Sequence, residues 1–164
     1  AGVLASDAAL KARLEGQDYL TTVVEQEADR SSARVTGAMI DYVEPGDAAA
    51  IVARLADPAI RIVSLTITEG GYYIDPASGR FDPEHADMRH DAQNPDAPKT
   101  VFGLILAGLK ARRVAGTAPF TVMSCDNIPH NGVVTREAVV ETAGSDPAET
   151  DKRHSARGRT GGVS

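Results

Sequence analysis

The sequence predicts an α/β fold in which a parallel sheet is flanked by helices and accompanied by a β-hairpin. Two segments, residues 61–68 and 119–125, are almost continuously apolar, which is typical of strands that are covered on both faces. A long polar loop, residues 69–97, and a segment with apolar residues at helical spacing lie between them. The order strand, loop, helix, strand is that of a βαβ unit, whose two strands pair in parallel.

The segments before the first of these strands predict two short helices and the hairpin. Asp7 is a candidate N-cap of the first helix, and Gly16 ends that helix. Two segments rich in β-forming residues then flank a polar run that suits a hairpin turn. The predicted elements are a helix over residues 7–15, strands over residues 19–27 and 33–43 with a turn at residues 28–32, and a helix over residues 46–56.

The second half of the chain predicts three further helices. Pro98 suits the first turn of one of them, because its fixed φ matches a helix, and Gly116 follows the last turn. Lys110, Arg112 and Arg113 are placed near the C-terminal end of this helix, where the helix dipole favours positive charge. Shorter helices are predicted near residues 83–93 and over residues 135–142.

The domain boundary is predicted from the point at which the apolar periodicity stops. Residues 1–140 form one domain in this interpretation, since a chain of 164 residues is long enough for a single core. Residues 141–164 show no apolar periodicity and are predicted to be a disordered tail.

Composition argues against several classes of function. The formal net charge of −6 disfavours a nucleic-acid partner, because binding to phosphates needs clustered Lys and Arg. No apolar run approaches the roughly 20 residues that a membrane span needs, so no membrane partner is expected. Cys125 is the single cysteine, which fits a reducing compartment and predicts a cytoplasmic location. At the end of an apolar strand it is expected to be a small buried residue, not a nucleophile paired with His130.

Polar residues follow both predicted strands. Ligands of parallel sheets bind beyond the carboxyl ends of the strands, so we expect residues 68–71 and 125–127 to face one crevice. The polar loop also contains a cluster of acidic and histidine residues, but a zinc site needs ligands that converge, and no metal is expected. We interpret the members of this cluster as solvated loop side chains: His85, Asp87, His90 and Asp91.

Four segments carry a resemblance to a known family. The motif Thr-Glu-Gly-Gly-Tyr at residues 68–72 follows the first apolar strand, and Ser-Cys-Asp-Asn at residues 124–127 ends the second. Together with residues 16–20 and 98–103, and in this order along the chain, these motifs resemble the mannitol dehydrogenase family of long-chain polyol dehydrogenases. The two motifs are specific in combination, and the resemblance covers roughly residues 1–140.

The resemblance implies a partial Rossmann-type domain that lacks the first βα unit. It implies NAD as cofactor and metal-free hydride transfer from the CH-OH group of a sugar alcohol, with D-mannitol as polyol and D-fructose as ketose substrate. Arabinitol, sorbitol and hexuronates remain alternatives. No Gly-x-Gly-x-x-Gly motif occurs, so we expect the chain to begin after the phosphate-binding loop. The family's general base is a lysine of a helical domain, so we expect the isolated chain to be inactive without the missing parts of its parent enzyme.

The resemblance also implies roles for individual residues. Asn127 corresponds to an asparagine that holds and polarises the reacting oxygen, a role that suits a neutral amide donor. Glu69 corresponds to a carboxylate on the proton path, and Thr68, Glu69 and Asn127 would lie beside the cofactor. Asp7 occupies the place of the acid that hydrogen-bonds the adenosine ribose and opposes the phosphate of NADP. Ser6 stands where relatives often carry Glu, which leaves the preference between NAD and NADP open.

Each of these residues also has a purely structural interpretation. Asn127 can cap a turn, Glu69 can be a solvated loop carboxylate, and Asp7 can be the N-cap of a helix. A second class of function therefore stays open, a non-catalytic binding or interaction module derived from such a domain. A metal- or cysteine-dependent hydrolase is a third, and it rests only on Cys125 and the histidine cluster.

Overall fold

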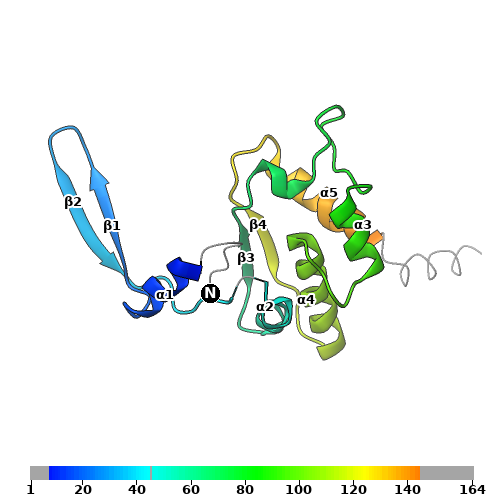
Figure 1. The fold of residues 1–164 in the computed structure, drawn as a ribbon, viewed down its shortest axis with the longest axis horizontal. Helices are drawn as coiled ribbons and strands as arrows, with labels where there is room; N and C mark the ends of the chain where they lie inside the picture. Colours follow the sequence, from blue (N-terminus) through cyan, green and yellow to red (C-terminus); the bar gives the residue numbers. More distant parts are fainter. Residues whose placement is uncertain (1–7, 45, 145–164) are drawn as a thin grey trace, which may run out of the picture. The chain divides into compact units, whose positions relative to one another are not determined.

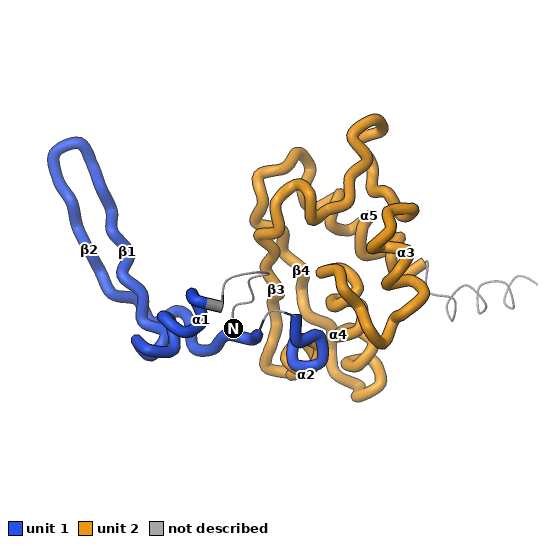
Figure 2. The backbone as a smooth tube through the Cα atoms, viewed as in Figure 1, with its two compact units in different colours: residues 1–51 blue, residues 52–164 orange. Residues whose placement is uncertain are grey.

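The computed structural model describes residues 8–44 and 46–144, and it divides into two compact units, residues 1–51 and 52–164 (Figures 1 and 2). The first unit holds a short helix and a β-hairpin, and the second holds a parallel strand pair with its helices. This content confirms the predicted α/β class with a hairpin, parallel strands and flanking helices. Within the described ranges, no helix is long and apolar enough to cross a membrane.

The hairpin of the first unit is shorter than predicted. Asp18 and Tyr19, just before it, have positive φ angles of 53° and 58°, which are incompatible with an extended strand. The pairing therefore begins with Thr21 opposite Thr36, and the second strand does not continue to residue 43 as predicted. The elements of this unit are the helix α1 (Ala8–Glu15) and the antiparallel strands β1 (Thr21–Gln26) and β2 (Ser31–Thr36).

The second unit is built on one parallel strand pair, β3 (Ile62–Leu65) and β4 (Thr121–Ser124). The helices along the chain are α2 (Ala48–Ala56), which spans the boundary between the units, the 3-10 helix η1 (Glu69–Tyr72), α3 (Ala86–Gln93), α4 (Val101–Ala115) and α5 (Asn131–Gly144). The chain passes from β3 to β4 through α4, which is the predicted βαβ order. Figure 1 shows α3, α4 and α5 gathered beside the strand pair.

The core of the second unit lies where the strand pair meets the helices. Tyr72, Phe102 and Ile105 are the largest fully buried side chains, and the ring centroids of Tyr72 and Phe102 are 6.0 Å apart. Leu65 at the end of β3 and Phe120 just before β4 belong to the same cluster, so the strands are fixed against α4. Complete burial of each such side chain contributes about 1.5–3 kcal/mol to folding.

Helix α4 has its N-cap at Thr100, so the first helical residue is not Pro98 as predicted. The Thr100 hydroxyl accepts a hydrogen bond from the Gly103 amide at 3.0 Å, which satisfies one of the free amides of the first turn. Gly116 ends the helix as predicted and has a φ of 67°, a value that glycine adopts without strain.

Helix α5 begins at Asn131, earlier than the predicted residue 135, and extends to Gly144. His130 has a φ of 53° and forms the turn before the helix. Its carbonyl oxygen accepts hydrogen bonds from the amides of Val133 at 2.8 Å and Val134 at 3.1 Å. Because the first turn closes on this carbonyl, the helix starts before its apolar periodicity becomes visible in the sequence.

Arg112 has a role that its place near the end of α4 did not predict. Its side chain is buried, and its guanidinium carbon lies 5.0 Å from the centroid of the Phe120 ring. The guanidinium donates hydrogen bonds to carbonyl oxygens of the end of α2 and of the segments that lead into β3 and β4. These are the carbonyls of Leu55, Asp57, Ile60 and Ala118. One side chain therefore ties together the amino ends of both strands.

Candidate functional site

The carboxyl ends of β3 and β4 lie side by side. Leu65 and Ser124 are paired as the last residues of their strands, and the Cys125 amide donates to the Leu65 carbonyl at 2.9 Å. The segments that follow, residues 66–72 and 125–130, therefore leave the sheet at the same edge, as the sequence predicts. In parallel α/β sheets this edge is where ligands bind.

A single carboxylate joins the two segments at this edge. Oδ2 of Asp126 accepts a hydrogen bond from the Ile67 amide at 3.0 Å, and Oδ1 accepts one from the Thr68 amide at 3.1 Å. The Tyr72 hydroxyl donates to Oδ2 at 2.7 Å. Desolvation raises the pKa of the Asp126 carboxyl, but these three hydrogen bonds outweigh it, and the pKa lies below its ordinary value. Asp126 therefore stays ionised and holds the turn after β3 to the turn after β4.

Tyr72 connects the Asp126 carboxylate to the core. Its side chain is fully buried, and its hydroxyl also lies 2.7 Å from Oγ of Ser124. Burial is the main cause that raises the pKa of Tyr72, so the hydroxyl remains a donor at neutral pH. Asn131, the first residue of α5, donates from Nδ2 to the carbonyl oxygens of Ser124 at 3.4 Å and Asp126 at 3.2 Å. The turn after β4 is thus held by both η1 and α5.

The turn after β3 has a backbone conformation that is rare for a residue with a side chain. Thr68 has a φ of 60° and a ψ of 171°, a region that glycine occupies almost exclusively. Of the two glycines that follow, Gly71 is required by packing, because an added Cβ would lie 2.9 Å from Cβ of Ile67. A Cβ added at Gly70 would meet no described atom within 4 Å. Gly70 therefore leaves room for a ligand at this edge.

The side chains predicted to carry the chemistry are exposed at this edge. Glu69 begins η1 directly after Thr68, and Asn127 directly follows Asp126. Neither the Glu69 nor the Asn127 side chain has a hydrogen bond or an ion pair to another residue in the described part of the chain. Both are therefore accessible to an incoming ligand. Asp7, the third predicted position, lies outside the described residues.

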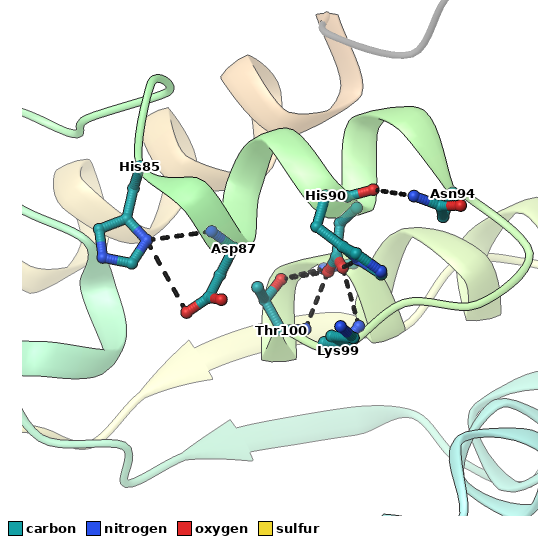
Figure 3. A network of polar contacts seen from close by, with 8 residues as sticks. His85, Asp87, His90, Asn94, Lys99 and Thr100 are labelled. Atoms are coloured by element: carbon teal, nitrogen blue, oxygen red, sulfur yellow. Dashed lines mark hydrogen bonds and ion pairs between the residues drawn. The ribbon is translucent and has the colours of Figure 1, made fainter.

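One member of the polar cluster, Asp91, has a different role from the predicted one, and Figure 3 shows the network of polar contacts in this region. Asp91 is not a solvated side chain, because it is only 4% exposed. Its carboxylate accepts hydrogen bonds from the amides of Lys99 and Thr100, both at 2.8 Å, and from the Thr100 hydroxyl at 2.7 Å. Burial raises the pKa of Asp91, but these bonds and the nearby His90 imidazole outweigh it and lower the pKa. The carboxylate thus fixes α3 to the start of α4.

The remaining members of that cluster do not assemble a metal site. His85 and Asp87 lie at the exposed start of α3, where His85 Nδ1 accepts a hydrogen bond from the Asp87 amide at 3.3 Å. Among the described residues, no three or more His, Cys, Asp or Glu side chains are placed to hold a metal ion. Cys125 is exposed and not buried as predicted, because its neighbours in the strand alternation, Ser124 and Asp126, take the more buried positions.

An open cleft of about 210 Å³ lies between β4 and α5 and does not include Glu69 or Asn127. Most of its surface is apolar, and its lining residues are Val122, Ser124, Gly132, Thr135, Arg136, Val139 and Val140. Ligand sites combine an apolar cavity with convergent polar groups. Because the accessible polar side chains gather at the strand ends instead, we place the candidate site there.

A βαβ unit whose polar residues gather beyond the carboxyl ends of its parallel strands is typical of ligand-binding α/β domains, of which the Rossmann-type nucleotide-binding domain is one class. A family model described as the mannitol dehydrogenase Rossmann domain matches residues 3–156. The chain belongs to the mannitol dehydrogenase family, a family of polyol oxidoreductases, as its motifs indicated.

Individual relatives agree with this assignment. The chain is 55% identical over 144 residues to a mannitol 2-dehydrogenase of Cereibacter sphaeroides, and the match covers 87% of the chain and 30% of the relative. It is 49% identical over 141 residues to a polyol:NADP oxidoreductase of Gluconobacter oxydans, covering 84% of the chain and 29% of the relative. The chain therefore spans less than a third of the length of these relatives.

Solved structures agree as well. The structure of a Pseudomonas fluorescens mannitol 2-dehydrogenase in a ternary complex with NAD and D-mannitol matches with a TM-score of 0.83 and 47% identity. This match covers 94% of the chain and 32% of the enzyme. A D-sorbitol dehydrogenase in substrate-free form also matches with a TM-score of 0.83, at 44% identity.

Proposed function

We propose that the chain supplies the cofactor side of the active site of an NAD-dependent polyol dehydrogenase that interconverts D-mannitol and D-fructose. The observation that carries the proposal is the pair of accessible side chains at one sheet edge. The Thr68 amide donates a hydrogen bond to the Asp126 carboxylate. Glu69 directly follows Thr68 in the chain, and Asn127 directly follows Asp126. The family and the D-mannitol complex of a relative at 47% identity support the choice of substrate.

Asn127 has the chemistry that the reacting oxygen requires. Its amide donates a hydrogen bond to the oxygen of the CH-OH group, and it does so without being deprotonated as negative charge develops there. The nicotinamide of NAD supplies the acceptor for the hydride. Because the Asn127 side chain has no hydrogen bond to other described residues, its amide is free to bind substrate.

Glu69 is proposed to relay the proton that leaves the polyol. A carboxylate transfers protons efficiently when it is accessible and not locked in an ion pair, and Glu69 fulfils both conditions within the described part of the chain. The turn that carries Thr68 and Glu69 is proposed to hold the nicotinamide half of NAD. The open space at Gly70 fits this role, because a flat ring can approach the backbone there.

NAD is preferred to NADP in this proposal because of Asp7. An acidic side chain at the ribose site hydrogen-bonds the 2′-hydroxyl of NAD and repels the 2′-phosphate of NADP. Among the relatives, the Pseudomonas fluorescens enzyme was solved with NAD, whereas the Gluconobacter oxydans protein is named for NADP. Calorimetric titration of both cofactors decides the point. Tighter binding of NAD, and a loss of that preference in Asp7→Ala, support the role of Asp7, while a preference that survives the substitution contradicts it.

The catalytic part of the proposal is tested in the complete gene product that carries this sequence. Asn127→Ala should lower kcat for D-mannitol oxidation by on the order of 100- to 1000-fold, the usual cost of removing one oxygen-binding donor. Gln93→Ala removes an exposed amide at the end of α3 and serves as the matched control, with unchanged rates. An Asn127→Ala enzyme that turns over as fast as the control refutes the role of Asn127.

A non-catalytic binding module derived from such a domain is the second candidate. Under both candidates we propose that the 164-residue chain alone oxidises no polyol and acts in the cytoplasm, where its exposed Cys125 stays reduced. Saturable NAD binding without turnover by the complete gene product would favour the module. Turnover that requires Asn127 favours the enzyme.

A further inference from the structure

We propose that Asp126 is a positioning residue, whose carboxylate holds Thr68 in its positive-φ conformation and thereby fixes Glu69 relative to Asn127. The chemistry of Glu69 and Asn127 rests on the proposed function, but the hold on Thr68 does not. Asp126 does not itself bind substrate in this proposal, because Oδ1 accepts from the Thr68 amide and Oδ2 accepts from the Ile67 amide and the Tyr72 hydroxyl.

The pattern of these hydrogen bonds selects a turn. In an extended strand, successive amides point to opposite sides, so one carboxylate cannot accept from two neighbours. Asp126 accepts from the neighbouring amides of Ile67 and Thr68, at 3.0 and 3.1 Å. The chain must therefore leave the strand direction at Ile67, and the next residue, Thr68, has the positive φ of 60°.

The positive-φ conformation of Thr68 needs an external cause. A β-branched residue such as Thr68 avoids this region unless its surroundings determine it. In the described structure the Thr68 side chain makes no hydrogen bond that caps η1. The Gly71 amide donates to the Thr68 carbonyl at 3.2 Å and holds the peptide after Thr68, while the hydrogen bond from the Thr68 amide to Asp126 holds the peptide before it. Without that contact we expect Thr68 to relax to a negative φ and Glu69, the next residue, to change direction.

Asp126 can act as a fixed point because it is itself held from two sides. The buried Tyr72 hydroxyl contacts it at 2.7 Å, and Nδ2 of Asn131 donates to its carbonyl at 3.2 Å. The same residue thus precedes Asn127 in the chain and binds the residue that precedes Glu69. The position of Asp126 therefore affects both proposed functional side chains, Asn127 through the peptide bond between them and Glu69 through Thr68.

Hydrogen–deuterium exchange in the complete gene product tests the hold on Thr68. Asp126→Asn keeps the size of the side chain, but its amide group cannot accept hydrogen bonds at both terminal atoms. We expect the peptides that cover residues 66–72 to exchange on the order of 10- to 100-fold faster, while those of α4 remain unchanged. Asp87→Asn removes an exposed carboxylate on α3 and is the matched control. Unchanged exchange of residues 66–72 in Asp126→Asn overturns the proposal.

A rescue experiment separates positioning from direct catalysis. We expect Asp126→Asn to lower kcat for D-mannitol on the order of 10- to 100-fold through misplacement of Glu69 and Asn127. Adding Thr68→Gly should restore most of the loss, because glycine adopts a φ of 60° without the hydrogen bond. A substrate-binding role for Asp126, or a general folding defect, predicts no recovery, and that result overturns the proposal.

If Asp126→Asn does not fold, Tyr72→Phe is a milder variant that tests the same proposal. It removes one hydrogen bond from Oδ2 of Asp126 and leaves the buried ring in place. We expect a smaller change of the same kind, again reversed by Thr68→Gly, and no reversal counts against the proposal. If the complete gene product oxidises no polyol, the proposed function fails, while the exchange of residues 66–72 still decides whether Asp126 holds the turn.

Discussion

A Cβ atom added to Gly103 would lie 2.2 Å from Oδ2 of Asp91. This relationship explains why α3 and α4 approach each other so closely. Gly103, in the first turn of α4, leaves the space that the Asp91 carboxylate needs to reach the amides of Lys99 and Thr100. The position of the Asp91 carboxylate therefore requires that residue 103 has no side chain.

Gly103→Ala is expected to destabilise the protein by about 1–3 kcal/mol, the usual cost of forcing an extra carbon into a packed core. This loss outweighs the roughly 1 kcal/mol by which alanine is the better helix former. Urea denaturation followed by circular dichroism measures the change. Gly132→Ala in α5 is the control, since its added Cβ meets no described atom within 4 Å, and it should be neutral or stabilising. Equal effects of the two substitutions would contradict the described contact.

Asp91 should make stability depend on acid pH. Its pKa is lowered in the folded protein, so the folded state binds this proton less readily than the unfolded chain does. The stabilisation is therefore fully present above the unfolded pKa of about 4 and is lost as pH falls through the lower folded pKa. Chemical denaturation between pH 2.5 and pH 7 records this as a fall in the free energy of unfolding toward acid.

Asp91→Asn isolates that contribution from the other carboxylates. Asp75 and Asp126 also have lowered pKa values and act in the same direction, so the wild type alone does not identify Asp91. The difference in the free energy of unfolding between wild type and Asp91→Asn should shrink as pH falls below about 4. A difference that is independent of pH would show that the charge of Asp91 contributes nothing to folding.

The fold was predictable because its strands and helices have strong apolar patterns. The strands around residues 62–65 and 121–124 are short, apolar and separated by a helix with a clear stripe, so their parallel pairing followed from the order of elements. The ends of elements were less predictable. Tyr19 was assigned to a strand on its β propensity, but its positive φ is set by the turn after α1, which no local pattern reveals.

The candidate site was predictable only in part. Glu69 and Asn127 were found because they follow apolar strands within recognisable motifs. Asp126 and Tyr72 were passed over as functional residues because their importance lies in a hydrogen bond across 54 positions of sequence. The available signal was the polar pair Ser124 and Asp126, which occupy alternate positions at the end of an apolar strand and so share one face.

Arg112 is expected to be the least replaceable charged residue of the second unit. Arg112→Lys should destabilise the protein by about 3 kcal/mol or more, because a single ammonium cannot reach carbonyls that the guanidinium fork now satisfies, and buried unpaired carbonyls are costly. The bonds at risk are those to Leu55, Asp57, Ile60 and Ala118. Thermal unfolding of Arg112→Lys beside Arg80→Lys, an exposed arginine of the same unit with the same change, tests this. Equal melting temperatures would show that the bonds carry little energy.

Alanine substitutions at Gly70 and Gly71 distinguish an effect on NAD binding from an effect on stability. Gly71→Ala should destabilise the turn by about 1–3 kcal/mol, because the new Cβ would lie 2.9 Å from Cβ of Ile67. Gly70→Ala should leave stability unchanged, since its Cβ would enter open space among the described residues. If the nicotinamide approaches this turn as proposed, Gly70→Ala should nevertheless weaken NAD binding, on the order of 10-fold, by calorimetric titration. NAD affinity that is unaffected by Gly70→Ala would place the cofactor away from this turn and leave Gly71 as a residue of the fold alone.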